Sequence, residues 1–423
     1  MKVPGGWLAL RRSLAIRDYR LFTLGNLMSN IGLWAQRVAL GWLTWELTHS
    51  TAWLGAIAVA ESVPTFVLGL VAGSIVDRAN YLKLLRVTQA LSLVYSLVMT
   101  GLVLGGWINI WLLLFLVLVR GSLGAFNRPS RMTVIFALVG RDLLTSAVTI
   151  NSIIFNVSRF IGPAVGGWII ASAGIGWAYA AAAAMFAVFT LILGLIKTGF
   201  AEPPKRASTT LTADTLEGLR YMIHHPGIGV MMTVLVVVAF LVKPLPDLLP
   251  GFVGQVFAMG PGGLAALMSA NGVGAMIAAS WLASRGGGIT GLTRVNLFGI
   301  AISCAAALGF ALVSEFWMAL VLIGVIGFAF ILQNVSNQTL LQAAADPSMR
   351  GRVISNYGLV NQGVPALGTL VIGAIAEHTG LNGPVAMGAV LGIGAWAWAW
   401  SRRRQLVSAL EVVPAEPPPE KAP

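Results

Sequence analysis

The sequence contains twelve apolar stretches that are each long enough to cross a membrane as a helix. About 20 residues span a hydrocarbon core of roughly 30 Å, because an α-helix rises about 1.5 Å per residue. We therefore predict an all-α integral membrane protein with spans at residues 20–46, 52–76, 82–106, 109–138, 146–172, 175–198, 226–257, 262–284, 290–313, 316–343, 353–377 and 380–401.

Charged residues are few and unevenly distributed. They make up 10% of the 423 residues, against 57% hydrophobic residues, which excludes an ordinary water-soluble domain. Residues 1–18 are basic and lack the apolar core of a signal peptide, so we expect the chain to start in the cytoplasm. Twelve crossings then leave nearly all the Lys and Arg residues on cytoplasmic segments. This positive-inside pattern predicts cytoplasmic termini, and it explains the net charge of +12 without nucleic-acid binding.

The longest polar stretch between spans divides the chain into two sets of six. We predict an N-terminal bundle at 1–198, a cytoplasmic linker at 199–225 with a surface helix at 214–223, and a C-terminal bundle at 226–402. The Pro-rich segment 403–423 is predicted to be a disordered cytoplasmic tail.

The two halves share a weak internal repeat. Arg37 in the first span is matched 206 positions later by Lys243 in the seventh, and Pro163 has a near counterpart in Pro365. Asn151 and Asn156 recur 205 positions later as Asn356 and Asn361. Such a repeat predicts two pseudo-symmetric six-helix bundles with a substrate site between them, although chance matches among apolar helices would give part of it.

The fifth span contains an unusually smooth surface, "SRFIGPAVGGW". Gly162 and Gly166 lie four residues apart, as do Pro163 and Gly167, so two adjacent helical stripes have almost no side chain. Small residues around Gly272 in the eighth span offer a matching surface. We predict a close helix contact at this seam, which would move during a conformational change; a kinked packing helix without further function is the alternative.

Four cations are expected inside the spans, and burying them is costly unless they face a wet cavity or pair with acids. They are Arg37, Arg120, Arg159 and Lys243, opposed by Glu61 and Asp247 at comparable depth. A cavity lined by all six would favour an anionic or catechol-like substrate. Lys243 and Asp247 are four residues apart, so they could instead neutralise each other. Neutral candidates for the cavity, which could equally serve helix packing, are Gln36, Asn151, Asn156, Asn334 and Asn361.

Three short motifs together resemble the major facilitator superfamily. Gly73, Asp77 and Arg78 in "GSIVDR" resemble its first loop signature, although Asn80 and Tyr81 depart from the glycine and basic residue that follow. The resemblance implies a gating role for Asp77 and Arg78. Arg120 and Gly124 resemble its fourth-span signature, which implies that Arg120 serves proton coupling or substrate binding.

The fifth-span motif resembles that of the superfamily's antiporters. Longer segments, including "LGNLMSNIGLWAQRVALGWLTWELTHS" and "EGLRYMIHHPGI", are similar to the enterobactin-exporter branch of bacterial drug and siderophore exporters. The resemblance implies a bacterial inner-membrane exporter with the major facilitator fold, cytoplasmic termini and no enzymatic activity.

We accordingly expect a secondary exporter of a drug-like compound or siderophore, coupled to protons through Glu61, Asp247 and Arg120. Its partners would be the substrate, protons and the lipid bilayer, and we expect a monomer. The alternatives are an ion-independent facilitator for a nutrient and a non-transporting receptor or scaffold. No phosphate-binding loop occurs, and "GGGITG" at 286–291 follows no predicted strand. The four histidines lack metal-ligand spacing, so no cofactor or metal is expected.

Overall fold

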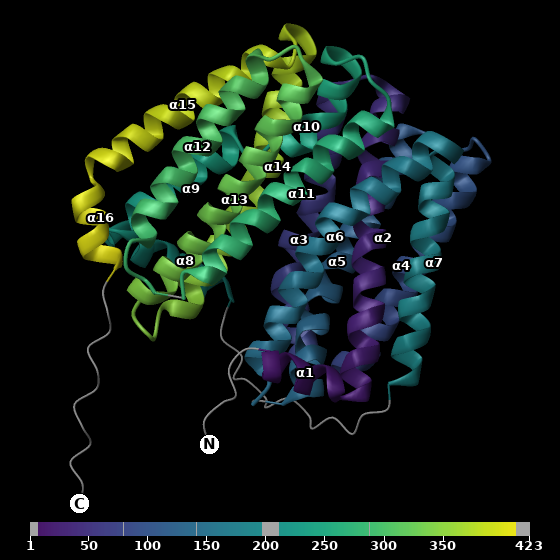
Figure 1. Cartoon of the computed structure of the whole chain (residues 1–423), viewed down its shortest axis with the longest axis horizontal. Helices are drawn as coiled ribbons and strands as arrows, with labels where there is room; N and C mark the ends of the chain where they lie inside the picture. Colours follow the sequence, from purple (N-terminus) through teal and green to yellow (C-terminus); the bar gives the residue numbers. More distant parts are fainter. Residues whose placement is uncertain (1–6, 79, 141, 197–210, 287, 412–423) are drawn as a thin grey trace, which may run out of the picture.

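The computed structural model describes residues 7–78, 80–140, 142–196, 211–286 and 288–411, with side chains for all of these except 7–9, 69–78 and 211–216. Every regular element in these ranges is a helix. The helices form two groups, one from each half of the chain, that lie side by side with the first helix, α1, and the last, α16, at the same end (Figure 1). We call that end, which also carries α1 and α8, the linker end, and the opposite one the far end.

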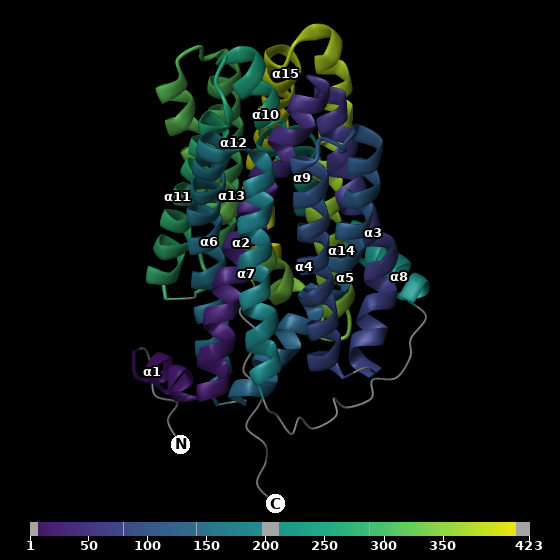
Figure 2. The same cartoon turned by 90° about the vertical axis from the view of Figure 1, so that its right-hand side faces the viewer.

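The N-terminal group holds the first six predicted spans. They correspond to long helices that run back and forth between the two ends (Figure 2). A short helix, α1 (Trp7–Ala15), precedes them at the linker end. The long helices are α2 (Arg17–Thr48), α3 (Thr51–Arg78), α4 (Tyr81–Leu104), α5 (Ile110–Val139), α6 (Leu144–Ala173) and α7 (Ile175–Leu195).

The C-terminal group holds the other six spans, and the first of these is broken. After the linker helix α8 (Leu211–His224), the seventh span consists of α9 (Ile228–Leu241), α10 (Leu245–Gly251) and a π-helical turn, η1 (Phe252–Val256). Pro244, which lacks an N–H, stands in the break between α9 and α10. The remaining spans are α11 (Pro261–Ser284), α12 (Leu292–Leu312), α13 (Phe316–Ala344), α14 (Arg350–Thr379) and α15 (Asn382–Ser401).

Eleven of the twelve predicted spans are apolar enough over 18 residues to count as membrane helices within the described part of the chain. The exception is α2, which at 32 residues has the length but not the hydropathy. Its polar residues include Asn26, Asn30 and Gln36, which are buried inside the protein. Because α2 packs against α6 and α7, those side chains do not contact lipid. Its low hydropathy therefore reflects an interior position.

The segment after α15 begins with structure, which corrects the prediction of a disordered tail from residue 403. Helix α16 (Arg403–Leu410) packs against α12 and α13 and buries Leu406 and Leu410 completely. The carboxylate of Glu411 then accepts hydrogen bonds from the backbone N–H groups of Gly291 and Thr293 at the start of α12. The apolar and capping contacts order this segment, which the Pro-rich composition did not indicate. The rest of the predicted tail lies outside the described residues.

The two halves meet through two pairs of helices, α3 with α14 and α6 with α11. A Cβ at Gly55 of α3 would lie 2.5 Å from the Cα of Leu370, and one at Gly272 of α11 would lie 2.8 Å from the carbonyl oxygen of Arg159. Only glycine permits backbones to approach so closely. The two groups diverge toward the linker end (Figure 1).

Candidate functional site

A cavity of about 670 Å³ lies between the two halves. Its walls come from α2 to α7 on one side and from α10, α11, α13 and α14 on the other. This is the size of a small-molecule site, and its placement at the interface means that a bound molecule would contact both halves.

The cavity contains more positive than negative groups. Its lining includes five arginines and two carboxylates. Glu61 and Asp247, the carboxylates, were predicted together with three of the arginines, Arg37, Arg120 and Arg159. The charge of the lining therefore favours anions.

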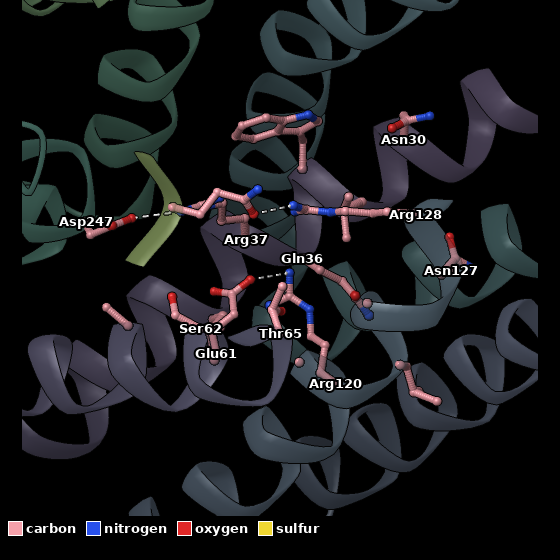
Figure 3. Close-up of a pocket in the computed structure, with 18 of the residues that line it drawn as sticks. Asn30, Gln36, Arg37, Glu61, Ser62, Thr65, Arg120, Asn127, Arg128 and Asp247 are labelled. Atoms are coloured by element: carbon pink, nitrogen blue, oxygen red, sulfur yellow. Dashed lines mark hydrogen bonds and ion pairs between the residues drawn. The ribbon is translucent and has the colours of Figure 1, made fainter. Parts of the chain in front are cut away.

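One ion pair crosses the cavity between the halves. Arg37 of α2 donates a hydrogen bond from Nη2 to Oδ1 of Asp247 on α10 at 2.9 Å. Both side chains are partly exposed, 38% and 27% respectively, so water reaches the pair. Figure 3 shows the two side chains extended toward each other from opposite walls. Separating the halves at this point requires the pair to break.

A second ion pair lies within the N-terminal half. Arg120 Nη2 of α5 is 3.2 Å from Glu61 Oε1 of α3, and both line the cavity (Figure 3). The guanidinium is more deeply buried than the carboxylate. Both predicted carboxylates are thus neutralised by arginines in this conformation, which leaves the other cavity arginines without an acidic partner among the described residues.

Arg159 joins α6 to α11 and to the aromatic wall of the cavity. Its Nη2 donates to Oδ1 of Asn271 at 2.6 Å, and its guanidinium lies 5.7 Å from the ring of Trp34. Arg37 lies 5.6 Å from the same ring. Trp34 is therefore held by two cation–π contacts, and Phe155 packs edge-on against it at 5.9 Å. Arg159 has only neutral partners in the described structure.

Arg128 and Arg131 of α5 also line the cavity, and neither was predicted as a cavity residue from the sequence. Arg128 donates to Gln362 Oε1 across the interface at 3.1 Å. Arg131 donates to Asn26 Oδ1 at 2.7 Å, and its Nε has no hydrogen-bond partner. A helical stripe could have revealed them, since they follow Arg120 at positions i+8 and i+11. From the sequence, both arginines were instead counted among the cytoplasmic basic residues that set the topology.

The predicted amides divide into two groups. Gln36, Asn151, Asn334 and Asn361 line the cavity. Asn156 does not; its Nδ2 donates within α6 to the carbonyl oxygen of Ser152 at 2.8 Å. Gln36 donates to Ser96 Oγ at 2.6 Å, and Asn151 accepts from Asn26 Nδ2 at 3.0 Å. These bonds fix the amide orientations on the cavity wall.

Lys243 lies behind the cavity wall. Its Nζ donates to Asn334 Oδ1 at 3.0 Å and to Asn361 Oδ1 at 2.5 Å, and those two amides face the cavity. The structure does not pair Lys243 with Asp247, the alternative raised by their spacing of four. The break between α9 and α10 separates the two residues, and Asp247 contacts Arg37 instead.

The smooth surface of α6 packs against two helices. A Cβ at Gly166 would lie 2.8 Å from the Cα of Ala35 on α2, and one at Gly162 would overlap Trp34. A Cβ at Gly167 would overlap Ala265 of α11. Pro163, on the same stripe as Gly167, is buried in α6. The first-loop residues Gly73, Asp77 and Arg78 belong to the last turns of α3, and their side chains lie outside the described residues.

A helix cap joins the two halves at the far end. Oε2 of Glu377 on α14 accepts hydrogen bonds from Ser50 Oγ and Thr51 N at 2.9 Å each, from Thr51 Oγ1 at 3.1 Å and from Ala52 N at 3.2 Å. A carboxylate here satisfies free N–H groups and complements the positive end of α3.

Two bundles of membrane-spanning helices around a charged cavity are the architecture of a transporter of the major facilitator type. Solved transporters share this fold. The bacterial homologue of the lysosomal transporter Spinster, inward-facing and occupied, superposes with a TM-score of 0.72 at 16% identity over 95% of this chain and 99% of its own. The nucleoside transporter NupG gives 0.71 at 12% identity, over 91% and 99%.

The chain belongs to the transmembrane secretion effector family, whose model matches residues 11–421. Its relatives are exporters and transporters. It is 26% identical to the multidrug efflux pump Tap of Mycolicibacterium fortuitum, over 82% of this chain and 86% of that one. It is 24% identical to the staphyloferrin A transporter of Staphylococcus aureus, over 86% and 90%. It is 23% identical to the enterobactin exporter EntS of Shigella flexneri, over 89% and 88%. The protein is therefore a multi-pass membrane transporter of small molecules and not an enzyme.

Proposed function

We propose that the protein exports an anionic, oxygen-rich small molecule in exchange for protons. The surplus of arginines over carboxylates in the cavity carries this proposal, because both carboxylates are already paired. Arg128, Arg131 and Arg159, with neutral partners only, would bind the carboxylate or catecholate groups of the substrate. Trp34 and Phe155 would pack against its aromatic or apolar part. Siderophores and anionic drugs have this chemistry, and the named relatives support the class.

Proton antiport would supply the energy. One charge moving through 100 mV releases about 2.3 kcal/mol, which sustains roughly a 50-fold gradient of a neutral substrate per proton. Glu61, Asp247 and Arg120 would couple the two fluxes, because their ion pairs must change partners when an anion enters among the arginines. Breaking Arg37–Asp247 would free one half from the other.

Transport would proceed by rocking of the two halves. Residues 1–198 and 226–402 would move about the cavity, with the stripe at Gly162, Pro163, Gly166 and Gly167 as the sliding surface. The joined far end and the diverging linker end would correspond to the state that accepts substrate from the cytoplasm. We place the protein in the bacterial inner membrane as a monomer with both termini cytoplasmic, in accord with its positive charges.

A deletion strain tests this function. Strains with and without the gene are grown in iron-replete and iron-starved media, and their exported metabolites and drug sensitivities are compared. We expect an anionic compound to accumulate inside the deletion strain and to be lost from its medium. If the parent strain excretes more of this compound when it is starved of iron, the substrate is a siderophore. If the two strains differ only in their drug sensitivity, the substrate is a drug. An intracellular deficit of a nutrient in the deletion strain would instead indicate uptake.

A further inference from the structure

Lys243 occupies an unusual site at the break of the seventh span. It lies between α9 and α10, and its backbone N–H bonds to the carbonyl oxygen of Val238 at 3.1 Å. Its Nζ contacts amide oxygens from two other helices, Asn334 of α13 and Asn361 of α14. The lysine therefore lies inside the C-terminal half, at the break between α9 and α10.

No carboxylate in the described structure lies within ion-pair distance of this amine. Helices α9, α13 and α15, which pack together around it, carry no charged residue. The carboxylates of Asp247 and Glu61 are engaged by Arg37 and Arg120. The charged residues and the histidine of α14 stand toward its ends; they are Arg350, Arg352, Glu377 and His378. Tyr357 of α14 is neutral as a phenol, and its hydroxyl donates to the carbonyl oxygen of Asn334 at 3.1 Å.

The hydrogen-bond geometry suits both charge states of the amine. A neutral amine has two N–H donors, and the site offers two acceptors, Asn334 Oδ1 and Asn361 Oδ1. An ammonium ion has a third N–H, which neither of these two hydrogen bonds uses. The cavity arginines cannot exchange protons in this way, because a guanidinium stays charged in proteins. Among the described cations at the cavity, Lys243 is therefore the one that can gain and lose a proton.

We propose that Lys243 takes up and releases the transported proton. Water at the far end gives a proton to the nitrogen lone pair, the new N–H bond leaves an ammonium ion, and water at the linker end later removes the same proton. The third N–H of the ammonium competes with Arg37 for Asp247, four residues away across the break. When the ammonium binds Asp247, the ion pair between Arg37 and Asp247 breaks and no longer holds the two halves together. The inference rests on the proposed antiport, to which it adds the proton-binding group.

Spin-label distances test the inference without any substrate. In a Cys304→Ser background, labels at Trp107→Cys and Asn382→Cys report the far end, and labels at Asp142→Cys and Arg285→Cys report the linker end; all four positions are exposed. Double electron–electron resonance is recorded in proteoliposomes between pH 5 and 9. We expect the parent protein to populate a far-end-open state at least threefold more at low than at high pH.

Two substitutions at Lys243 separate charge from fold. Lys243→Gln keeps two N–H donors without the charge, and we expect the far end to stay closed at every pH. Lys243→Arg fixes the charge, and we expect both states at every pH. Lys83→Met changes an exposed lysine at the start of α4 and should keep the parental pH dependence. Circular dichroism and size exclusion would verify the fold, and Lys243→Met would replace the glutamine variant if that variant misfolds.

The inference is overturned if the parental pH dependence survives in the folded glutamine or methionine variant, or if the parent shows none. Loss of the dependence in Glu61→Gln alone would assign the proton to that carboxylate instead. The antiport itself is checked separately by proton flux in proteoliposomes loaded with staphyloferrin A or enterobactin. Proton flux that persists in Lys243→Gln refutes only the proton-carrying role of Lys243. Absence of export with both probes in the parent protein refutes the proposed function for these probes.

Discussion

Arg37 and Asp247, 210 positions apart in the sequence, form an ion pair of 2.9 Å that ties the two halves together across the cavity. Every outward movement of one half from the other at this level must break the pair. Its members lie on α2 and on α10, the segment beyond the break in the seventh span. The pair therefore stands where a change of charge would affect both binding and movement.

Substitution of either partner should impair export. We expect Arg37→Gln or Asp247→Asn to lower the export rate in inverted vesicles by about tenfold, because each leaves a partly buried charge unpaired. The exchanged variant Arg37→Asp/Asp247→Arg should recover part of the rate. The exposed pair Arg17–Asp18, at 3.7 Å, offers a control, since Arg17→Gln should export normally. Parental rates in both single variants would show that the pair has no part in transport.

The glycine seam of α6 should matter for movement more than for insertion. In Gly166→Leu the new side chain would meet the backbone of Ala35, whose Cα lies 2.8 Å from the position that a Cβ would take. We expect membrane levels near those of the parent and an export rate reduced at least about tenfold, since a close helix contact is lost. Gly194→Leu on α7, where a Cβ meets nothing within 4 Å, is the matched control. Equal export by the two variants would argue against the seam.

Glu377 should hold the far end closed. Removal of its charge in Glu377→Gln weakens four hydrogen bonds at the start of α3, and helix caps of this kind contribute about 0.5–2 kcal/mol. We expect a membrane-impermeant maleimide added from the far side to label Thr44→Cys, in the cavity wall, several times faster in this variant. His378→Asn is the control at the neighbouring exposed position. Unchanged labelling would mean that other contacts close the far end.

His225 should make stability depend on pH at the linker end. Burial lowers the pKa of His225 below its usual 6.5, partly opposed by Asp346. Its Nδ1 is placed to accept from the backbone N–H groups of Gly227 and Ile228 at the start of α9, which requires that nitrogen to be unprotonated. The contribution is therefore complete above about pH 6.5 and is lost as the pH falls through the lowered folded pKa.

A melting series checks that sign. Between pH 7.5 and 5, the Tm of the parent in detergent should fall more than that of His225→Asn, whose amide oxygen can accept at every pH. His224→Asn, at an exposed neighbour, should follow the parent. A steeper fall in the His225→Asn variant than in the parent would contradict the assignment.

Hydropathy predicted the helices well because a membrane-spanning helix must be long and apolar. The hydropathy of α2 is lower than that of the other spans, because its Asn26 and Asn30 are buried within the protein and do not face lipid. Three of the five arginines and both carboxylates of the cavity were predicted from the sequence, since buried charges need partners. Their pairing was not, because Arg37–Asp247 depends on tertiary contacts and on the break after α9. Arg128 escaped prediction because its charge was counted among the cytoplasmic basic residues that set topology, although the predicted span 109–138 and helix α5 both continue well past it.

Proton-coupled export of an anion is the central claim, and one measurement tests it most directly. Proteoliposomes containing the protein are given a pH gradient, acidic inside, and the uptake of radiolabelled staphyloferrin A or enterobactin is recorded together with internal pH. We predict accumulation of at least one probe above its external concentration, with matching alkalinisation of the lumen, and loss of both when an uncoupler is added. Accumulation without proton movement, or merely equal concentrations on the two sides with both probes, would contradict the account.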